Sequence, residues 1–253
     1  MNTSMKAQLT KLFRLRPSGE TAVAILAGLV VVGLSAAMIP AGNWPWLRIV
    51  LRDLGQVFLA GIVFPLIFIR RTETGLADFG LSLVRWRLLL PINLALGALL
   101  LLLFVSKNPP PSGFRVTALT IWTAGYVMLT LCFETVFFYS FMRVLLTRAF
   151  GSVPAIALTA VFYSLHHMGF QPEYGKLFFV GVMYATACQL GGSVWVILPF
   201  FLGVGGTYDV LVQSRVVSPI LHVEMRTVAL ALLILPTVAW ASMGRKTSRS
   251  TGR

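Results

Sequence analysis

The stretch FETVFFYSFMR (residues 133–143) places a carboxylate, Glu134, inside an apolar run that extends over residues 117–142. A helix needs about 20 mostly apolar residues to cross the hydrocarbon layer of a bilayer, and this run is long enough. A charge at that depth costs at least about 2.5–3.5 kcal/mol, so it predicts either a partner or a functional site. The stretch therefore indicates a membrane helix that carries a candidate site.

The composition of the whole chain favours a membrane protein. Of its 253 residues, 57% are hydrophobic and 11% are charged, whereas soluble domains average about 45–50% and 25%. The net charge of +13 does not indicate nucleic acid, because Lys and Arg occur in short clusters between apolar runs. We therefore expect the lipid bilayer as a partner and no nucleic acid. Cys132 and Cys188 lie inside apolar runs and are predicted to be buried thiols without a disulfide.

Apolar runs of sufficient length predict an all-α, polytopic membrane bundle with about eight transmembrane helices. Residues 21–243 form this domain, after a basic amphipathic segment at 1–20 and before a basic tail at 244–253. The predicted spans are 21–42, 50–69, 87–105, 117–142, 153–170, 175–191, 193–214 and 226–243.

The distribution of Lys and Arg between alternate loops predicts the orientation of the bundle. The side that carries both termini has 14 of these residues, and the opposite side has seven. Positively charged loops are retained in the cytoplasm, so both termini are expected there.

Few titratable residues lie deep in the predicted spans. With a helical rise of about 1.5 Å per residue, Glu134 lies roughly 13 Å from the cytoplasmic end of its helix, and His166 lies roughly 20 Å along the next helix. The two side chains can therefore meet, and a carboxylate beside an imidazole suits general acid–base activation of water. An alternative stays open: Glu134 pairs with a basic or amide group that locks the helices together, and His166 is a hydrogen-bonded core residue.

The other histidines carry weaker predictions. His167 is expected to project about 100° away from His166 and to lie at a helix interface. His222 falls in an outer loop and is expected to be solvated. A divalent cation such as Zn²⁺ has at most Glu134, His166 and Asp209 as ligands, because no His-x-x-x-His or Cys-x-x-Cys spacing accompanies them.

Two short motifs point to a known family. The sequence FYSLH, with Phe162 and His166, fits the pattern Phe-x-x-x-His. The sequence ETVFFY partly fits Glu-Glu-x-x-x-Arg, with Thr135 at the second Glu position and Tyr139 at the Arg position. In these motifs, over about residues 76–212, the chain resembles the CPBP family of CAAX-protease and bacteriocin-processing membrane proteins, also called abortive-infection proteins.

The third motif of that family is only partly present. The helix start GSVW resembles the one that precedes this motif, but Phe201 and Gly205 stand where the family has His and Asn. Tyr208 and Asp209 are candidate replacements for these two groups. Arg143, four residues after Tyr139, is a candidate to replace the missing Arg in pairing with a carboxylate.

The resemblance implies an intramembrane endopeptidase in the inner (plasma) membrane of a bacterium. In such an enzyme Glu134 and His166 activate the water that hydrolyses a peptide bond of a membrane protein or prenylated peptide. The missing His and Asn would stabilise the oxyanion, so a second interpretation remains open. It is an inactive family member that binds or regulates membrane proteins or lipidated peptides.

Overall fold

The computed structural model describes most of the chain, namely residues 11–72, 74–82, 86–107, 115–201, 206, 210 and 220–243. All regular structure in these ranges is helical, which confirms the predicted all-α class. The elements are α2 (Gly19–Ala37), η1 (Pro40–Asn43), α3 (Pro45–Ile49), η2 (Val50–Val63), α4 (Phe64–Arg71), η3 (Leu76–Phe79), α5 (Trp86–Lys107), α6 (Ala118–Glu134), η4 (Thr135–Met142), α7 (Arg143–Phe150), α8 (Ser152–Leu165), α9 (Tyr174–Gly191), α10 (Val194–Phe201) and α12 (Val223–Met243).

Five helical segments among the described residues are long and apolar enough to cross a bilayer, which is compatible with an integral membrane protein. Two of them are composite, because α3, η2 and α4 run on continuously, as do α6, η4 and α7. The five segments are Gly19–Ala37, Pro45–Arg71, Trp86–Lys107, Ala118–Phe150 and Val223–Met243.

Three of the eight predicted spans fall outside these five segments. The ranges 153–170 and 175–191 correspond to α8 and α9, of 14 and 18 residues. The range 193–214 begins with α10, and most of its remaining residues lie outside the described part of the chain. A bundle of eight spans therefore stays a prediction.

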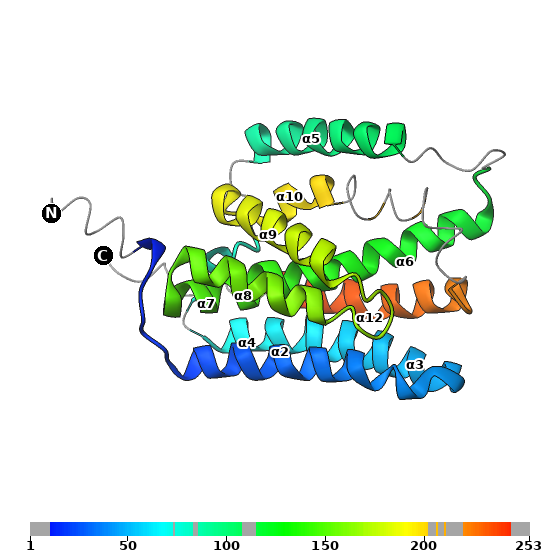
Figure 1. Ribbon diagram of the computed structural model, residues 1–253, viewed down its shortest axis with the longest axis horizontal. Helices are drawn as coiled ribbons and strands as arrows, with labels where there is room; N and C mark the ends of the chain where they lie inside the picture. Colours follow the sequence, from blue (N-terminus) through cyan, green and yellow to red (C-terminus); the bar gives the residue numbers. More distant parts are fainter. Residues whose placement is uncertain are drawn as a thin grey trace, which may run out of the picture.

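The long helices lie side by side, with α2 and α4 along one face and α5 on the opposite outer face (Figure 1). Between these faces α12 packs on α6, and α8 packs against both α7 and α9. The start of α2 and the end of α12 lie at the same end of the bundle. The segment Pro45–Arg71 runs back along α2, so Arg70 lies near the start of α2, and it donates to the Trp240 carbonyl of α12 at 2.8 Å. At the same end, Glu20 of α2 pairs with Arg148 of α7 at 3.3 Å.

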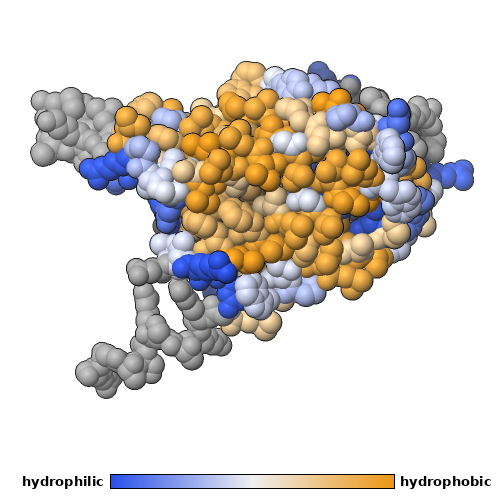
Figure 2. All heavy atoms as spheres, turned by 90° about the horizontal axis from the view of Figure 1, so that it is seen from below, coloured by the Kyte–Doolittle hydropathy of each residue, from blue (hydrophilic) through white to orange (hydrophobic). Residues whose placement is uncertain are grey.

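The surface that carries α2 is hydrophobic between two hydrophilic ends (Figure 2). Leu26, Leu29 and Val30 of α2 are all more than half exposed there. An apolar band flanked by charged and polar ends is the surface that a bilayer requires.

The composite segment Ala118–Phe150 is the central helix of the bundle. Its apolar window is 83% buried, compared with 33% for Gly19–Ala37. Phe137, Phe138 and Phe141 are each fully buried, and the rings of Phe137 and Phe138 meet edge to face with centroids 4.9 Å apart. The phenylalanines around Glu134 therefore form the protein core.

A buried ion pair joins three helices at the end of the bundle away from Glu20. Arg226 of α12 donates to both carboxylate oxygens of Asp53 in η2, at 2.6 and 2.8 Å. The Tyr126 hydroxyl of α6 donates to Asp53 Oδ1 at 2.8 Å and accepts from Arg226 at 2.6 Å. This bidentate geometry engages the whole carboxylate of Asp53.

Gly61 lets η2 approach the central helix closely. A Cβ at this position would lie 1.9 Å from Cδ2 of Phe133, the residue before Glu134, and Phe133 is 2% exposed. We expect Gly61→Ala to lower the free energy of unfolding by about 1–3 kcal/mol, because the buried ring has no room to move aside. Thermal unfolding in one detergent measures this. Gly33→Ala is the matched control, since a Cβ there meets nothing within 4 Å; equal losses of stability in the two variants would contradict the prediction.

Candidate functional site

Glu134 lies at the point where the central helix changes its hydrogen bonding. Helix α6 ends at Glu134, and over Thr135–Met142 the N–H groups pair five residues back instead of four. Wide turns of this kind occur frequently at functional sites. The Glu134 side chain is 12% exposed, so it is largely desolvated and still reachable.

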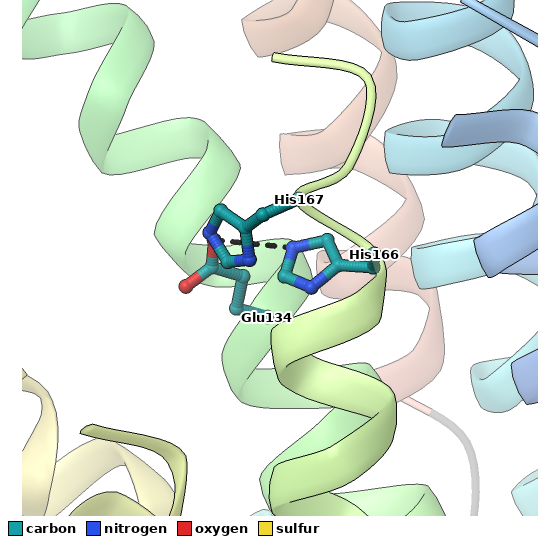
Figure 3. Close-up of side chains that lie close together, drawn as sticks. All are labelled: Glu134, His166 and His167. Carbon is teal, nitrogen blue, oxygen red and sulfur yellow. Dashed lines mark ion pairs between the residues drawn. The ribbon is translucent and has the colours of Figure 1, made fainter. Parts of the chain in front are cut away.

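Two histidine rings face this carboxylate from the turn that follows α8 (Figure 3). The Nε2 atoms of His166 and His167 lie 3.6 and 3.8 Å from Oε1 of Glu134. The structure thus brings Glu134 and His166 together, as the helix lengths predicted. The expectation that His167 lies apart is wrong, because α8 ends at Leu165 and the 100° spacing of a helix does not extend beyond it.

One backbone carbonyl orients both imidazoles. The Nδ1 atoms of His166 and His167 lie 2.5 and 2.8 Å from the carbonyl oxygen of Tyr163. A carbonyl oxygen only accepts hydrogen bonds, so each Nδ1 carries the proton and each Nε2 carries a lone pair. An N–H bond to a carbonyl on the far side of the ring is the usual support of histidines that act as ligands.

Three electron-pair donors therefore converge on one point. Suitable atoms of Glu134, His166 and His167 all lie within 4.8 Å of one another. Nε2 of His166 is buried and has no hydrogen-bond partner among the described residues. A buried polar atom of this kind is costly unless something satisfies it. A water molecule that donates to the carboxylate and to one ring does so, and so does a divalent cation.

The ligand set fits a cation such as Zn²⁺. Two imidazole nitrogens and one carboxylate oxygen are ligands that Zn²⁺ accepts, and three protein ligands leave a fourth position open for water. Asp209, which the sequence suggested as a third ligand, lies outside the described residues. Its place in the set is taken by His167.

Neighbouring side chains hold the cluster in position. Gln56 of η2 donates to the carbonyl oxygens of Val31 and His166, at 3.2 and 3.3 Å. The Tyr163 side chain hydrogen-bonds to the Glu134 carboxylate. Sequence reasoning missed both residues. Gln56 had a signal, because it is an amide inside the apolar run 50–69, whereas nothing in the sequence distinguished Tyr163.

Two proposed supporting residues take other roles. Arg143 donates through Nε to the Tyr139 carbonyl at 2.8 Å and through Nη1 to the Gln189 side chain, so its expected pairing with a carboxylate is wrong. Nine residues of helix, about 13 Å, separate it from Glu134. Tyr139 is buried, and its hydroxyl has no hydrogen-bond partner among the described residues. Its ring packs against Phe201, with centroids 5.2 Å apart.

The remaining motif residues pack or lie outside the described chain. Phe162 faces α2, where a Cβ added at Gly28 would lie 2.7 Å from its ring. Phe201 is 1% exposed and lies against the Tyr184 ring at 4.1 Å, so it supplies no hydrogen-bond donor. Gly205, Tyr208 and Asp209 lie outside the described residues.

Metal affinity is expected to depend on His167. Loss of an outer partner of a metal ligand typically lowers affinity 10–100-fold, so we expect His167→Ala, which removes a ligand, to weaken Zn²⁺ binding at least about 10-fold. Competition with a fluorescent chelator on the purified protein measures this. His222→Ala is the control, because His222 is exposed and stacks on Trp46 with centroids 5.0 Å apart. Equal Zn²⁺ affinities of the two variants would argue against a site at Glu134.

Comparison of the chain with known protein families, curated proteins and solved structures finds no match. The likeness to the CPBP family therefore rests on the motifs alone.

Proposed function

We propose that the protein is a CPBP-type intramembrane endopeptidase, which hydrolyses peptide bonds of membrane or prenylated substrates. The observation that carries the proposal is the convergence of three lone-pair atoms, from Glu134, His166 and His167, in a largely buried position. A helix lock needs one donor and one acceptor, and the Tyr163 hydroxyl already supplies a donor to Glu134. The two imidazole Nε2 atoms add two further acceptors beside that carboxylate, and this set suits the binding of a water or a cation.

The side chains of this cluster can make every proton transfer that peptide hydrolysis requires. Water donates one hydrogen to Glu134 Oε1 and the other to an imidazole Nε2. These two hydrogen bonds direct the lone pairs of the water oxygen away from the cluster and towards the substrate. As this oxygen attacks the carbonyl carbon, Glu134 takes a proton and the C=O electron pair moves to oxygen. The protonated Glu134 then donates to the amine nitrogen as the C–N bond breaks. General acid–base catalysis of this kind contributes about 10²–10⁴-fold in rate.

The same three atoms of Glu134, His166 and His167 would hold a divalent cation. Such a cation supplies Lewis acidity and makes a bound water more acidic. With the cation bound, the protein side chains would still accept and donate the protons.

The membrane placement belongs to the same proposal: eight spans, with both termini cytoplasmic, in a bacterial inner membrane. Glu134 is the middle residue of the 33-residue segment Ala118–Phe150, which supports a site at membrane depth. Arg14, Arg70 and Arg148 contact elements at the end of the bundle where α2 begins, which supports a cytoplasmic location for that end.

One observation favours the second candidate function, a non-catalytic binding or regulatory protein of the membrane. The family's oxyanion donor at the position of Phe201 is replaced by a ring that packs into the core. Losing one such donor lowers kcat about 10²–10³-fold in well-studied hydrolases.

Hydrolysis in ¹⁸O-labelled water separates the two functions. The purified protein in detergent is incubated with membrane-span peptides and farnesylated peptides, and the products are analysed by mass spectrometry. A peptidase of the proposed type adds one ¹⁸O atom to the new carboxyl group. Binding of these peptides without cleavage would overturn the peptidase proposal and support the binding protein.

A further inference from the structure

Arg52 of η2 carries a positive charge and lies within ion-pair distance of no described carboxylate. Its neighbour Asp53 is the nearest acidic residue in the sequence, yet Arg226 and Tyr126 occupy both oxygens of that carboxylate. Within the described part of the chain, the Arg52 guanidinium makes no hydrogen bond or ion pair. It lies over the ring of Phe170, with Cζ 4.0 Å from the centroid, and 5.6 Å from that of Tyr126.

The Phe170 ring connects Arg52 to the candidate site. Its centroid is 5.0 Å from that of His167, so Arg52 Cζ lies at most 9.0 Å from the His167 ring centre, the sum of 4.0 and 5.0 Å. Gln56, four residues further along η2, donates to the His166 carbonyl. The face of η2 that carries Arg52 is therefore turned towards the site.

The site lacks a donor of the kind that Arg52 offers. Glu134 and the two Nε2 atoms are acceptors, the Tyr163 hydroxyl is bonded to Glu134 and carries no charge, and Phe201 supplies no donor. A guanidinium has five N–H donors, and its hydrogen bonds to anionic oxygen are among the strongest in proteins. Donors that are already in place act most strongly on developing charge when water is excluded.

We infer that Arg52 is the oxyanion-binding residue of this site, in the role for which the family pattern has other residues. The inference rests on the proposed hydrolysis. When the water oxygen attacks and Glu134 takes its proton, the carbonyl π pair becomes a lone pair on oxygen, and an Arg52 N–H donates to that O⁻. The pair returns to carbon as the C–N bond breaks and Glu134 protonates the leaving amine, so Arg52 undergoes no net change.

Steady-state kinetics test this role. We expect Arg52→Gln to lower kcat about 10²–10³-fold with a much smaller change in KM, because the contact forms only in the transition state. Arg52→Lys retains a cationic donor and is expected to recover part of kcat. Arg70→Gln is the matched control, since Arg70 donates to the Trp240 carbonyl at 2.8 Å, at the end of the bundle where α2 begins. Equal kcat values for Arg52→Gln and Arg70→Gln would overturn the inference and leave the hydrolase proposal intact.

A binding experiment gives a readout that needs no turnover. The probes are acetylated tetraleucine amide and its analogue with an anionic phosphinate in place of the central peptide bond, in detergent that contains a chelator. On a Glu134→Gln background, we expect the phosphinate to bind at least 10-fold more tightly than the amide. Adding Arg52→Gln removes that preference and leaves amide affinity unchanged.

The outcomes distinguish the two proposals. A preference for the phosphinate that depends on Arg52, in a protein that hydrolyses none of the peptides tried, would remove the peptidase proposal and keep the anion-binding role. Equal affinity for the two probes, or binding of neither, would overturn the role of Arg52 even if wild type hydrolyses peptides.

Discussion

Glu134→Gln is expected to lower kcat for peptide hydrolysis by about 10²–10⁴-fold, because an amide cannot accept the proton of the attacking water. The substitution preserves the shape of a side chain that is 12% exposed, so the bundle is expected to fold. The proton transfer takes place only during the reaction, so KM should change much less than kcat. Initial rates over a range of peptide concentrations measure both constants.

Glu173→Gln is the matched control for this variant. It removes the same charge from a residue outside the five candidate spans, where hydrogen bonds from Gln171 and Lys176 lower the pKa of the carboxyl group. We expect its kcat to equal that of wild type. Full activity in Glu134→Gln would refute the assigned role, and parallel losses in both variants would indicate a general effect of charge.

Arg226→Leu is expected to lower the free energy of unfolding by about 3–5 kcal/mol, because it leaves the Asp53 carboxylate buried without its cation. Asp53 and Arg226 are each 8% exposed, and their ion pair joins η2 to α12. Among the described residues, Tyr126 then remains as the side-chain donor to Asp53. Unfolding in mixed detergent, followed by circular dichroism, measures the loss.

Two further variants make this prediction specific. Arg148→Leu breaks the pair with Glu20, whose side chains are 33% and 41% exposed, and is expected to cost at most about 1 kcal/mol. The double variant Asp53→Leu with Arg226→Leu is expected to recover part of the stability, since no buried charge is left unpaired. If Arg226→Leu lowered the free energy of unfolding no more than Arg148→Leu, the buried ion pair would stabilise the fold no more than the exposed pair does.

Local patterns in the sequence were sufficient for the class of fold. Long apolar runs and a composition with few charged residues predicted an all-helical bundle, because hydropathy and helix length depend on consecutive residues. The helical rise per residue along two neighbouring spans also predicted that Glu134 and His166 can meet. Phe162 fitted a motif, but its packing against α2 depends on Gly28, 134 residues earlier, and was not predictable.

The contacts of the candidate site could not all be predicted from local sequence patterns. His167 joins the cluster because α8 stops at Leu165, and the cap of a helix depends on what the following turn packs against. Arg52 makes no ion pair with a described residue, because Asp53 bonds to Arg226, 173 residues away in sequence. The sequence by itself determined which residues are apolar, helical and deep. Only the tertiary structure decided which polar groups meet, because a buried charge pairs with whichever neighbour the packing of distant helices places within hydrogen-bond reach.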